Sequence, residues 1–215
     1  MTSIAPSHAA DPRIADVLSY WLGSAHPDNA GALACKNLWF IKSDATDDQI
    51  RERFGALVKD ALAGQLDGWA GTALGRLALI VLLDQFTRNL FRGTARSFAG
   101  DPQALQLALD GIALGHDRHA DLPAVARIFC YLPLEHAEDL ALQDRSVAAF
   151  QALADQAGDV GGGGVREFLA GTLDYAHRHR DVIVRYGRFP HRNAILGRTS
   201  TPEELQYLSQ PGSGF

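Results

Sequence analysis

The chain has 215 residues, of which 47% are hydrophobic and 21% charged, and its formal net charge is −5. This composition is that of an ordinary globular protein and excludes collagen-like, mucin-like and wholly disordered chains. The acidic balance argues against a dedicated nucleic-acid binder, because such proteins usually carry a positive excess. The length suits one domain, and we expect a single helical domain over residues 1–215 with its core at about 11–209.

The cysteines and the apolar runs indicate where in the cell the protein is expected. The longest strongly apolar run covers residues 77–83, far short of the roughly 20 residues that span a bilayer. The first residues contain no basic segment followed by an apolar stretch, as a secretory signal would. Cys35 and Cys130 form no CxxC or zinc spacing, so we expect two reduced, buried thiols. We therefore expect a cytoplasmic protein with no membrane or nucleic-acid partner, and the sequence leaves its oligomeric state open.

Capping residues followed by apolar positions at spacings of three and four predict helices in the first half of the chain. Asp11 stands before a proline and Thr72 before a long apolar segment, and both are typical N-cap residues. Gly23 and Gly64 fit the ends of helices. The predicted helices run from Asp11 to Gly23, from Thr46 to Gly64 and from Thr72 to about Asn89, and residues 24–45 are predicted to form a long loop anchored by its aromatic residues.

The second half continues in the same way. Pro133 is expected to break or kink the chain, because a proline inside a helix removes a hydrogen bond. The glycine run 161–164 lacks the Lys and Ser or Thr of a phosphate loop and is expected to be a flexible connector. Few stretches alternate in the manner of a strand, so the predicted class is all-α, an antiparallel helical array. Further helices are predicted to begin at Asp101, Leu122, about Leu134, Val165 and Thr201.

Two charged residues lie within the most apolar of these helices. Asp84 and Arg88 share one stripe with Leu77 and Val81, and the neighbouring positions are apolar as well. A helix that is apolar all round is a buried one, where a lone charge is costly. Four residues apart, the two side chains can pair. The pair is either a structural link between helices or the wall of a functional site.

Further polar residues continue apolar faces. Glu135 and Glu138 extend the core stripe of the helix predicted from Leu134, and His136 lies beside them. Acidic residues favour the first turn of a helix, which is one explanation, and a carboxylate lining a pocket is the other. His179 lies near the middle of the apolar arc of the helix from Val165. It is either a hydrogen-bonded core histidine or part of a site.

An arginine-rich segment follows that helix. Residues 177–198 contain six arginines and one acidic residue, which makes a positive region in an acidic protein. The planar donor group of arginine suits carboxylate and phosphate groups. Residues 88–93 have a loosely similar composition. The two segments either converge on an anion-binding pocket, with His191 and His179 at its edge, or form exposed charged loops.

Three motifs, LDQFTRN at 83–89, YLPLEHAED at 131–139 and GRFPHRN at 187–193, occur in that order. In these motifs the chain resembles the bacterial "domain of unknown function 924" family, over about residues 14–208, with Thr87 where proline or serine is expected. The resemblance implies an all-helical fold similar to tetratricopeptide-repeat superhelices, and it implies no known reaction. Carried onto this chain, the motif residues are Asp84, Gln85, Arg88, Asn89, Glu135, His136, Glu138, Arg188, His191, Arg192 and Asn193.

The leading hypothesis is that these residues converge in one polar pocket that binds an anionic small molecule. If the pocket is catalytic, we expect hydrolysis or proton transfer, carried by Glu135, His136 and His191. No dinucleotide, nucleophile-elbow or metal-ligand motif is present, so no cofactor and no metal is expected. The alternatives are a module that binds a peptide carboxylate and a purely structural network. The expected ligand-binding residues are Asp84, Gln85, Arg88, Asn89, Glu138, His179, Arg188, Arg192 and Asn193.

Overall fold

In the computed structural model, which describes residues 11–160 and 163–214, the chain consists of helices joined by turns. None of the described residues lies in a β-strand, which confirms the predicted all-α class. The likeness to a tetratricopeptide-repeat superhelix and the extent of the domain stay predictions. Over the same residues, none of the helices combines the length and the apolar character needed to cross a membrane.

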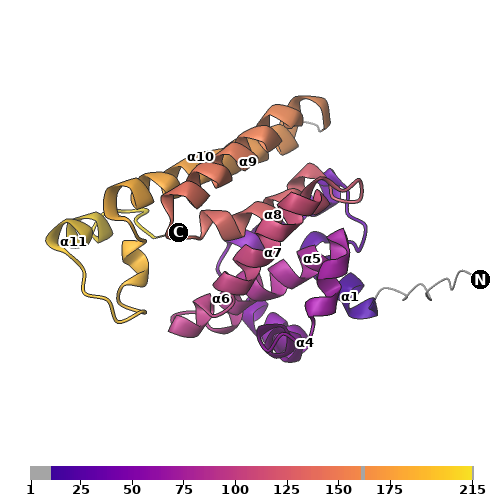
Figure 1. Cartoon of the computed structure of the whole chain (residues 1–215), viewed down its shortest axis with the longest axis horizontal. Coiled ribbons are helices and arrows are strands. Elements are labelled where there is room, and N and C mark those ends of the chain that lie inside the picture. The colour runs from indigo at the N-terminus through magenta and orange to yellow at the C-terminus, as the bar shows by residue number, and fades with distance from the viewer. Residues whose placement is uncertain (1–10, 161–162, 215) are drawn as a thin grey trace, which may run out of the picture.

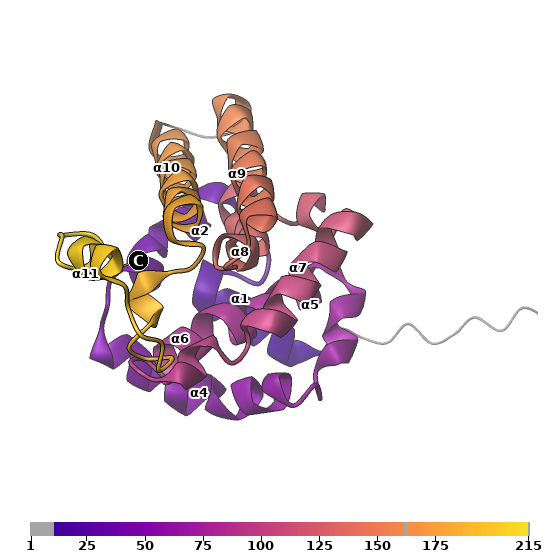
Figure 2. The same ribbon diagram turned by 60° about the vertical axis from the view of Figure 1, so that its left-hand side comes forward.

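The two longest helices form an antiparallel pair at one side of the molecule. These are α9 (Leu140–Val160) and α10 (Gly163–Tyr186), and they lie side by side in both views (Figures 1 and 2). Helix α8 (Ala124–Glu135) packs against this pair and also contacts α5 (Ala73–Ile80) and α7 (Asp101–Leu114). Helix α8 thereby connects the pair to the rest of the core.

The N-terminal helices begin and end at capping residues. The carboxylate of Asp11 caps α1 (Pro12–Leu22), and Gly23 ends it with a φ of 78°, as predicted. Helix α4 (Asp44–Leu62) begins two residues before its predicted start, because Ser43 is the cap and not Thr46.

The prediction of one long loop over residues 24–45 is wrong in part. This segment contains α2 (Asn29–Ala34) and α3 (Lys36–Phe40), and the Asp28 side chain caps α2. Helices of five or six residues are too short to give a clear apolar period, so the pattern did not reveal them. The expected aromatic anchor is present, since the ring N–H of Trp39 donates to a main-chain carbonyl of α1 at 2.7 Å.

The predicted helix from Thr72 to Asn89 is present but irregular. It consists of α5, a π-helical segment (Val81–Phe86) and α6 (Thr87–Leu90), and Thr72 caps its start as predicted. The Thr87 hydroxyl donates to the carbonyl oxygen of Leu83 at 2.6 Å inside the widened turn. Such π-helical turns change the direction in which side chains leave the helix, and they are frequent at functional sites.

Pro133 does not end its helix where the sequence predicts. Helix α8 continues through Pro133 to Glu135, and α9 begins at Leu140 and not at Leu134. The actual start signal is Asp139, whose carboxylate accepts the N–H of Leu142 at 2.9 Å. Glu135 therefore lies at the C-terminal end of α8, where compensation of a helix N-terminus cannot explain it.

Two further helix starts differ in part from the predictions. Helix α7 begins at Asp101 as predicted, but Gly100 is its cap, and the Asp101 carboxylate is directed elsewhere. Of the glycine run predicted to be a connector, Gly163 and Gly164 begin α10, and residues 161–162 lie outside the described residues. The remaining elements are α11 (Pro202–Leu208) and 3-10 turns at Asp67–Gly71, Ala95–Phe98, His116–Arg118 and Pro190–Arg192.

Candidate functional site

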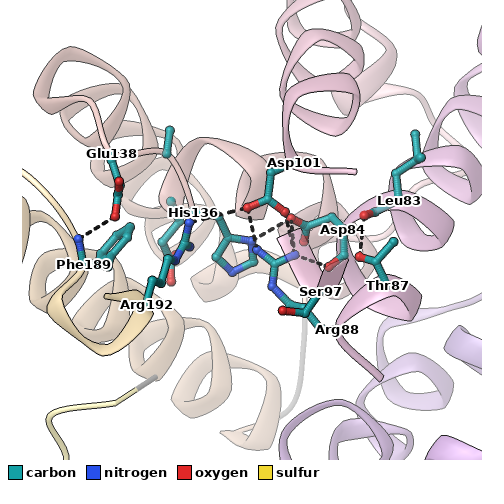
Figure 3. A network of polar contacts seen from close by, with 12 residues as sticks. Leu83, Asp84, Thr87, Arg88, Ser97, Asp101, His136, Glu138, Phe189 and Arg192 are labelled. Carbon is teal, nitrogen blue, oxygen red and sulfur yellow. Dashed lines mark hydrogen bonds and ion pairs between the residues drawn. The ribbon is translucent and has the colours of Figure 1, made fainter. Parts of the chain in front are cut away.

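Four segments that are far apart in the sequence bring polar side chains together. Asp84 comes from the π-helical segment, Asp101 from the start of α7, His136 from the turn after α8, and Arg192 from the 3-10 turn after α10 (Figure 3). Arg88 completes this group, which we call the polar network. Each of the three sequence motifs therefore contributes at least one residue to it.

The buried carboxylate of Asp84 organises one half of the network. Its Oδ1 atom lies 2.7 Å from His136 Nδ1 and 3.3 Å from Arg88 Nη1, and its Oδ2 atom accepts a hydrogen bond from Gln85. Asp84 is fully buried, which alone would raise its pKa, but Arg88 and His136 hold the pKa below its usual range. Asp84 is thus an ionised acceptor that orients three neighbouring donors.

Asp101 joins the two arginines of the network. Its carboxylate accepts hydrogen bonds from Arg88 at 2.9 and 3.2 Å and lies 3.5 Å from Nη1 of Arg192. Arg88 also donates to the main-chain carbonyl of Asp84. One carboxylate therefore serves two guanidinium groups, and Arg88 holds the shorter contacts.

Arg192 is held in an unusual environment for a charged side chain. Its guanidinium carbon lies 4.7 Å from the ring centre of Phe98 and 4.6 Å from that of Phe189. Burial, together with the nearby Arg88 charge, lowers the pKa of Arg192 to about 10. Its Nε atom is buried and finds no hydrogen-bond acceptor among the described residues.

Glu135 and His179 form a second buried carboxylate–imidazole contact beside the network. His179 Nδ1 lies 3.0 Å from Glu135 Oε1 and 2.9 Å from the carbonyl oxygen of Tyr175, so this nitrogen carries the proton. The His179 ring also lies 6.3 Å from that of His136, centre to centre. Nearby, Gln143 donates to the carbonyl oxygens of Glu135 at 2.6 Å and of Ala137 at 2.8 Å, which satisfies groups left open at and after the end of α8.

Glu138 fixes the arginine-rich segment next to the network. Its carboxylate accepts the main-chain N–H of Phe189 at 2.8 Å and forms a paired contact with Arg198 at 2.6 and 2.9 Å. Burial opposes its ionisation, but these donors lower the pKa of Glu138. The charge of Glu138 is thus used to position the loop.

The ring centre of His191 lies 5.7 Å from that of Phe189. Burial and the neighbouring Arg192 lower its pKa to about 4. His191 is therefore a neutral imidazole at physiological pH.

Three further predicted site residues contact partners outside the network. Arg188 pairs with Glu204 at 2.7 and 2.8 Å, and Asn193 donates to the same carboxylate at 3.2 Å. Asn89 donates to Asp47 of α4 at 2.7 Å. The partners of these side chains are Glu204 and Asp47, which do not belong to the polar network.

The residues of the network differ in their exposure to solvent, and we call the two most exposed, Arg88 and Asp101, its rim. The side chains of Arg88 and Asp101 are 22% and 20% exposed, that of His136 is 14% exposed, and that of Arg192 is 9% exposed. Four cavities found in the described part of the chain are lined by other residues. Within that same part, no group of three or more His, Cys, Asp or Glu side chains is placed to hold a metal ion.

Sequence reasoning missed the residues that complete the network. For Asp101 the sequence predicts only the start of a helix, although an acidic side chain beside a capping glycine is free to pair elsewhere. Phe98 and Phe189, which enclose Arg192, carry no signal in the periodicity because they lie in or beside short 3-10 turns. Arg198 could be found only as one of several arginines in its segment.

Comparisons with known proteins agree with the three motifs. The model of the family "Bacterial protein of unknown function (DUF924)" matches residues 17–212. The solved structure of a protein of unknown function, ATU0120 from Agrobacterium tumefaciens, is 40% identical, with a TM-score of 0.74, and the alignment covers 92% of this chain and 97% of that one. No curated protein matches the chain. Because the family model spans most of the sequence and all three motifs, the chain belongs to the bacterial protein family of unknown function DUF924.

Proposed function

We propose that the polar network binds the anionic head group of a small molecule at Arg192 and that His136 exchanges a proton with it. The observation that carries this proposal is the buried Nε–H of Arg192, for which the described residues provide no acceptor. A buried donor left without an acceptor is costly, and the penalty is larger for a charged group. A carboxylate or phosphate oxygen would supply the missing acceptor.

The charge balance around Arg192 supports an anionic partner. Its nearest carboxylate, Asp101, already makes two hydrogen bonds to Arg88. The Arg192 charge is therefore incompletely compensated within a low-dielectric environment, where electrostatic interactions are strong. Phe98 and Phe189 keep the guanidinium plane in place, so little side-chain entropy would be lost on binding.

The protonation state of His136 is the one that a general base needs. Because Asp84 is ionised and can only accept, the proton of His136 lies on Nδ1, and Nε2 keeps its lone pair. Burial and the Arg88 charge lower the pKa of His136, which favours the neutral ring. A neutral imidazole oriented by a buried carboxylate is the arrangement that general-base catalysts use. His136 would then take a proton either from a substrate bound at Arg192 or from a water molecule that attacks this substrate.

The low solvent exposure of the network limits how much of a ligand can enter it. The rim residues Arg88 and Asp101 are about one-fifth exposed, and Arg192 is nearly buried. The site therefore suits a single carboxylate or phosphate group, with the rest of the molecule outside.

Titration calorimetry with inorganic phosphate and with acetate tests the binding step. We expect saturable binding of at least one of them, which R192Q reduces at least tenfold. The matched control is R178Q, which removes the same charge from an arginine on the solvent face of α10 that pairs with Asp174. Equal affinities in wild type and R192Q, or no binding of either anion at concentrations up to tens of millimolar, would contradict the proposal.

The proton step has its own measurement. Calorimetry of the same anion in two buffers that differ in ionisation enthalpy gives the number of protons taken up or released on binding. We expect a nonzero number for wild type near pH 6 and a clearly different number for H136Q, in which only the anion itself is left to exchange protons, with affinity retained. An unchanged proton number in H136Q would remove His136 from the proposed role and leave the binding step intact.

A further inference from the structure

A second concave surface lies between α4 and the segment that follows α6. Its volume is about 550 Å³, which is within the range of pockets that hold small molecules. Its lining differs from that of the polar network and shares no residue with it. The lining residues are Arg51, Gly55, Lys59, Leu62, Ala63, Leu90, Phe91 and Arg96.

One face of α4 forms the first wall. Arg51, Gly55 and Lys59 follow one another at intervals of four residues, so their side chains share a stripe. The neighbouring stripe of α4, which contains Phe54 and Val58, is buried in the core. The groove therefore lies at the edge of the buried face of α4, where Arg51, Gly55 and Lys59 line it.

Gly55 gives the groove its depth. A Cβ atom built at this position would lie 3.9 Å from Leu90, so the absence of a side chain leaves room above the apolar floor. The floor consists of Leu62, Leu90 and Phe91, which are partly buried and pack against the core.

The rim of the groove is positively charged. Three cations, Arg51, Lys59 and Arg96, stand among the lining residues, and none of those lining residues is acidic. The guanidinium of Arg96 lies 4.0 Å from the ring centre of Phe91, which fixes its charge at the edge of the floor. Arg51 also contacts Asp48 on its own helix, so Lys59 and Arg96 provide the less compensated charges.

An apolar floor beneath a cationic rim is complementary to a molecule with an apolar body and one negative group. We infer that this groove is a binding site for a small amphipathic carboxylate, such as a medium-chain fatty acid or an aromatic acid. The carboxylate lies between Lys59 and Arg96, and the apolar body covers Leu62, Leu90 and Phe91. The site is separate from the anion site at Arg192 and does not depend on it.

Amide chemical shifts in the full-length protein, titrated with octanoate, test this inference. We expect saturable shifts of Gly55 and Leu90, and affinities at least tenfold weaker for 1-octanol, which lacks the charge, and for acetate, which lacks the chain. The double variant K59Q/R96Q is expected to weaken octanoate binding about tenfold. The control R53Q removes one charge from the same helix at a side chain that stacks on Tyr20 and does not line the groove.

A second variant keeps the test decisive. G55L fills the groove with a helix-compatible side chain, and we expect it to abolish octanoate binding without loss of helical circular dichroism. Equal binding of octanoate and octanol, shifts confined to residues around Arg192, or binding of an acidic peptide without binding of octanoate would each overturn the inference.

Discussion

At the residue scale, His191 makes the stability of the folded protein depend on pH. Its pKa is lowered to about 4 by burial and by Arg192, whereas an unperturbed histidine titrates near 6.5. Between these two values the unfolded chain binds one more proton than the folded protein. The free energy of unfolding therefore falls as the pH is lowered from about 6.5 to about 4, and this contribution is complete above that window.

We predict that H191Q reduces this pH dependence. For wild type, the His191 contribution lost between pH 7 and pH 5 is on the order of 2 kcal/mol. Urea denaturation at the two pH values measures it in wild type, in H191Q and in H177Q, in which an exposed histidine of α10 is replaced. A loss between pH 7 and pH 5 that is the same in all three proteins would show that His191 does not titrate as described.

At the element scale, the start of α7 is pressed against the π-helical segment. A Cβ atom at Gly100 would lie 2.2 Å from the carbonyl oxygen of Leu83, a distance that no side chain can occupy. Gly100 precedes Asp101, so this close approach also sets the position of the carboxylate that joins the two arginines of the network. The contact therefore couples helix packing to the geometry of the site.

We predict that G100A lowers the free energy of unfolding by about 1–3 kcal/mol, as overpacking does, and weakens phosphate binding. Gly171 is the matched control: it lies exposed in α10, where a Cβ atom would meet nothing within 4 Å. G171A is expected to stabilise the protein by about 0.5–1 kcal/mol, because alanine loses less backbone entropy in a helix. Denaturant titrations of both variants measure the difference, and a neutral G100A would contradict the packing argument.

Some helices and contacts could be predicted from the sequence and others could not. Caps and apolar periods located most helices, and the four-residue spacing of Asp84 and Arg88 indicated the ion pair that is found at 3.3 Å. The helix through Pro133 and the short helices α2 and α3 depend on local and tertiary contacts that leave no period. The contact between Asp101 and Arg192 is unpredictable from one sequence, because it joins residues about 90 positions apart.

At the scale of the whole molecule, the two thiols differ in how easily a reagent reaches them. Cys130 lies in the main hydrophobic core, and burial raises its pKa to about 12, whereas Cys35 is only half-buried, contrary to the expectation of two buried thiols. Thiolates, and not thiols, react with disulfide reagents. Cys130 therefore becomes reactive only when the core opens.

We predict that 5,5′-dithiobis(2-nitrobenzoate) modifies Cys35 quickly and Cys130 more slowly by a factor on the order of 10³ or more, since the latter requires unfolding. The C35S variant isolates the slow reaction, and its rate should rise steeply with urea. Fast modification of C35S in native buffer would mean that the core around Cys130 opens locally.

The π-helical segment makes the length of the helix formed by α5, this segment and α6 as important as its residues. A widened turn of this kind accommodates one more residue than a regular helix of the same rise. Removing one residue between Val81 and Leu83 would therefore let the turn close to a regular helical one, and the helix on either side would keep its alignment. Removing one residue from the regular turns of α5 would instead rotate everything before it by about a hundred degrees relative to Asp84 and Arg88. Related proteins that retain both charged residues are thus expected to vary in length by one residue within this segment and not within α5.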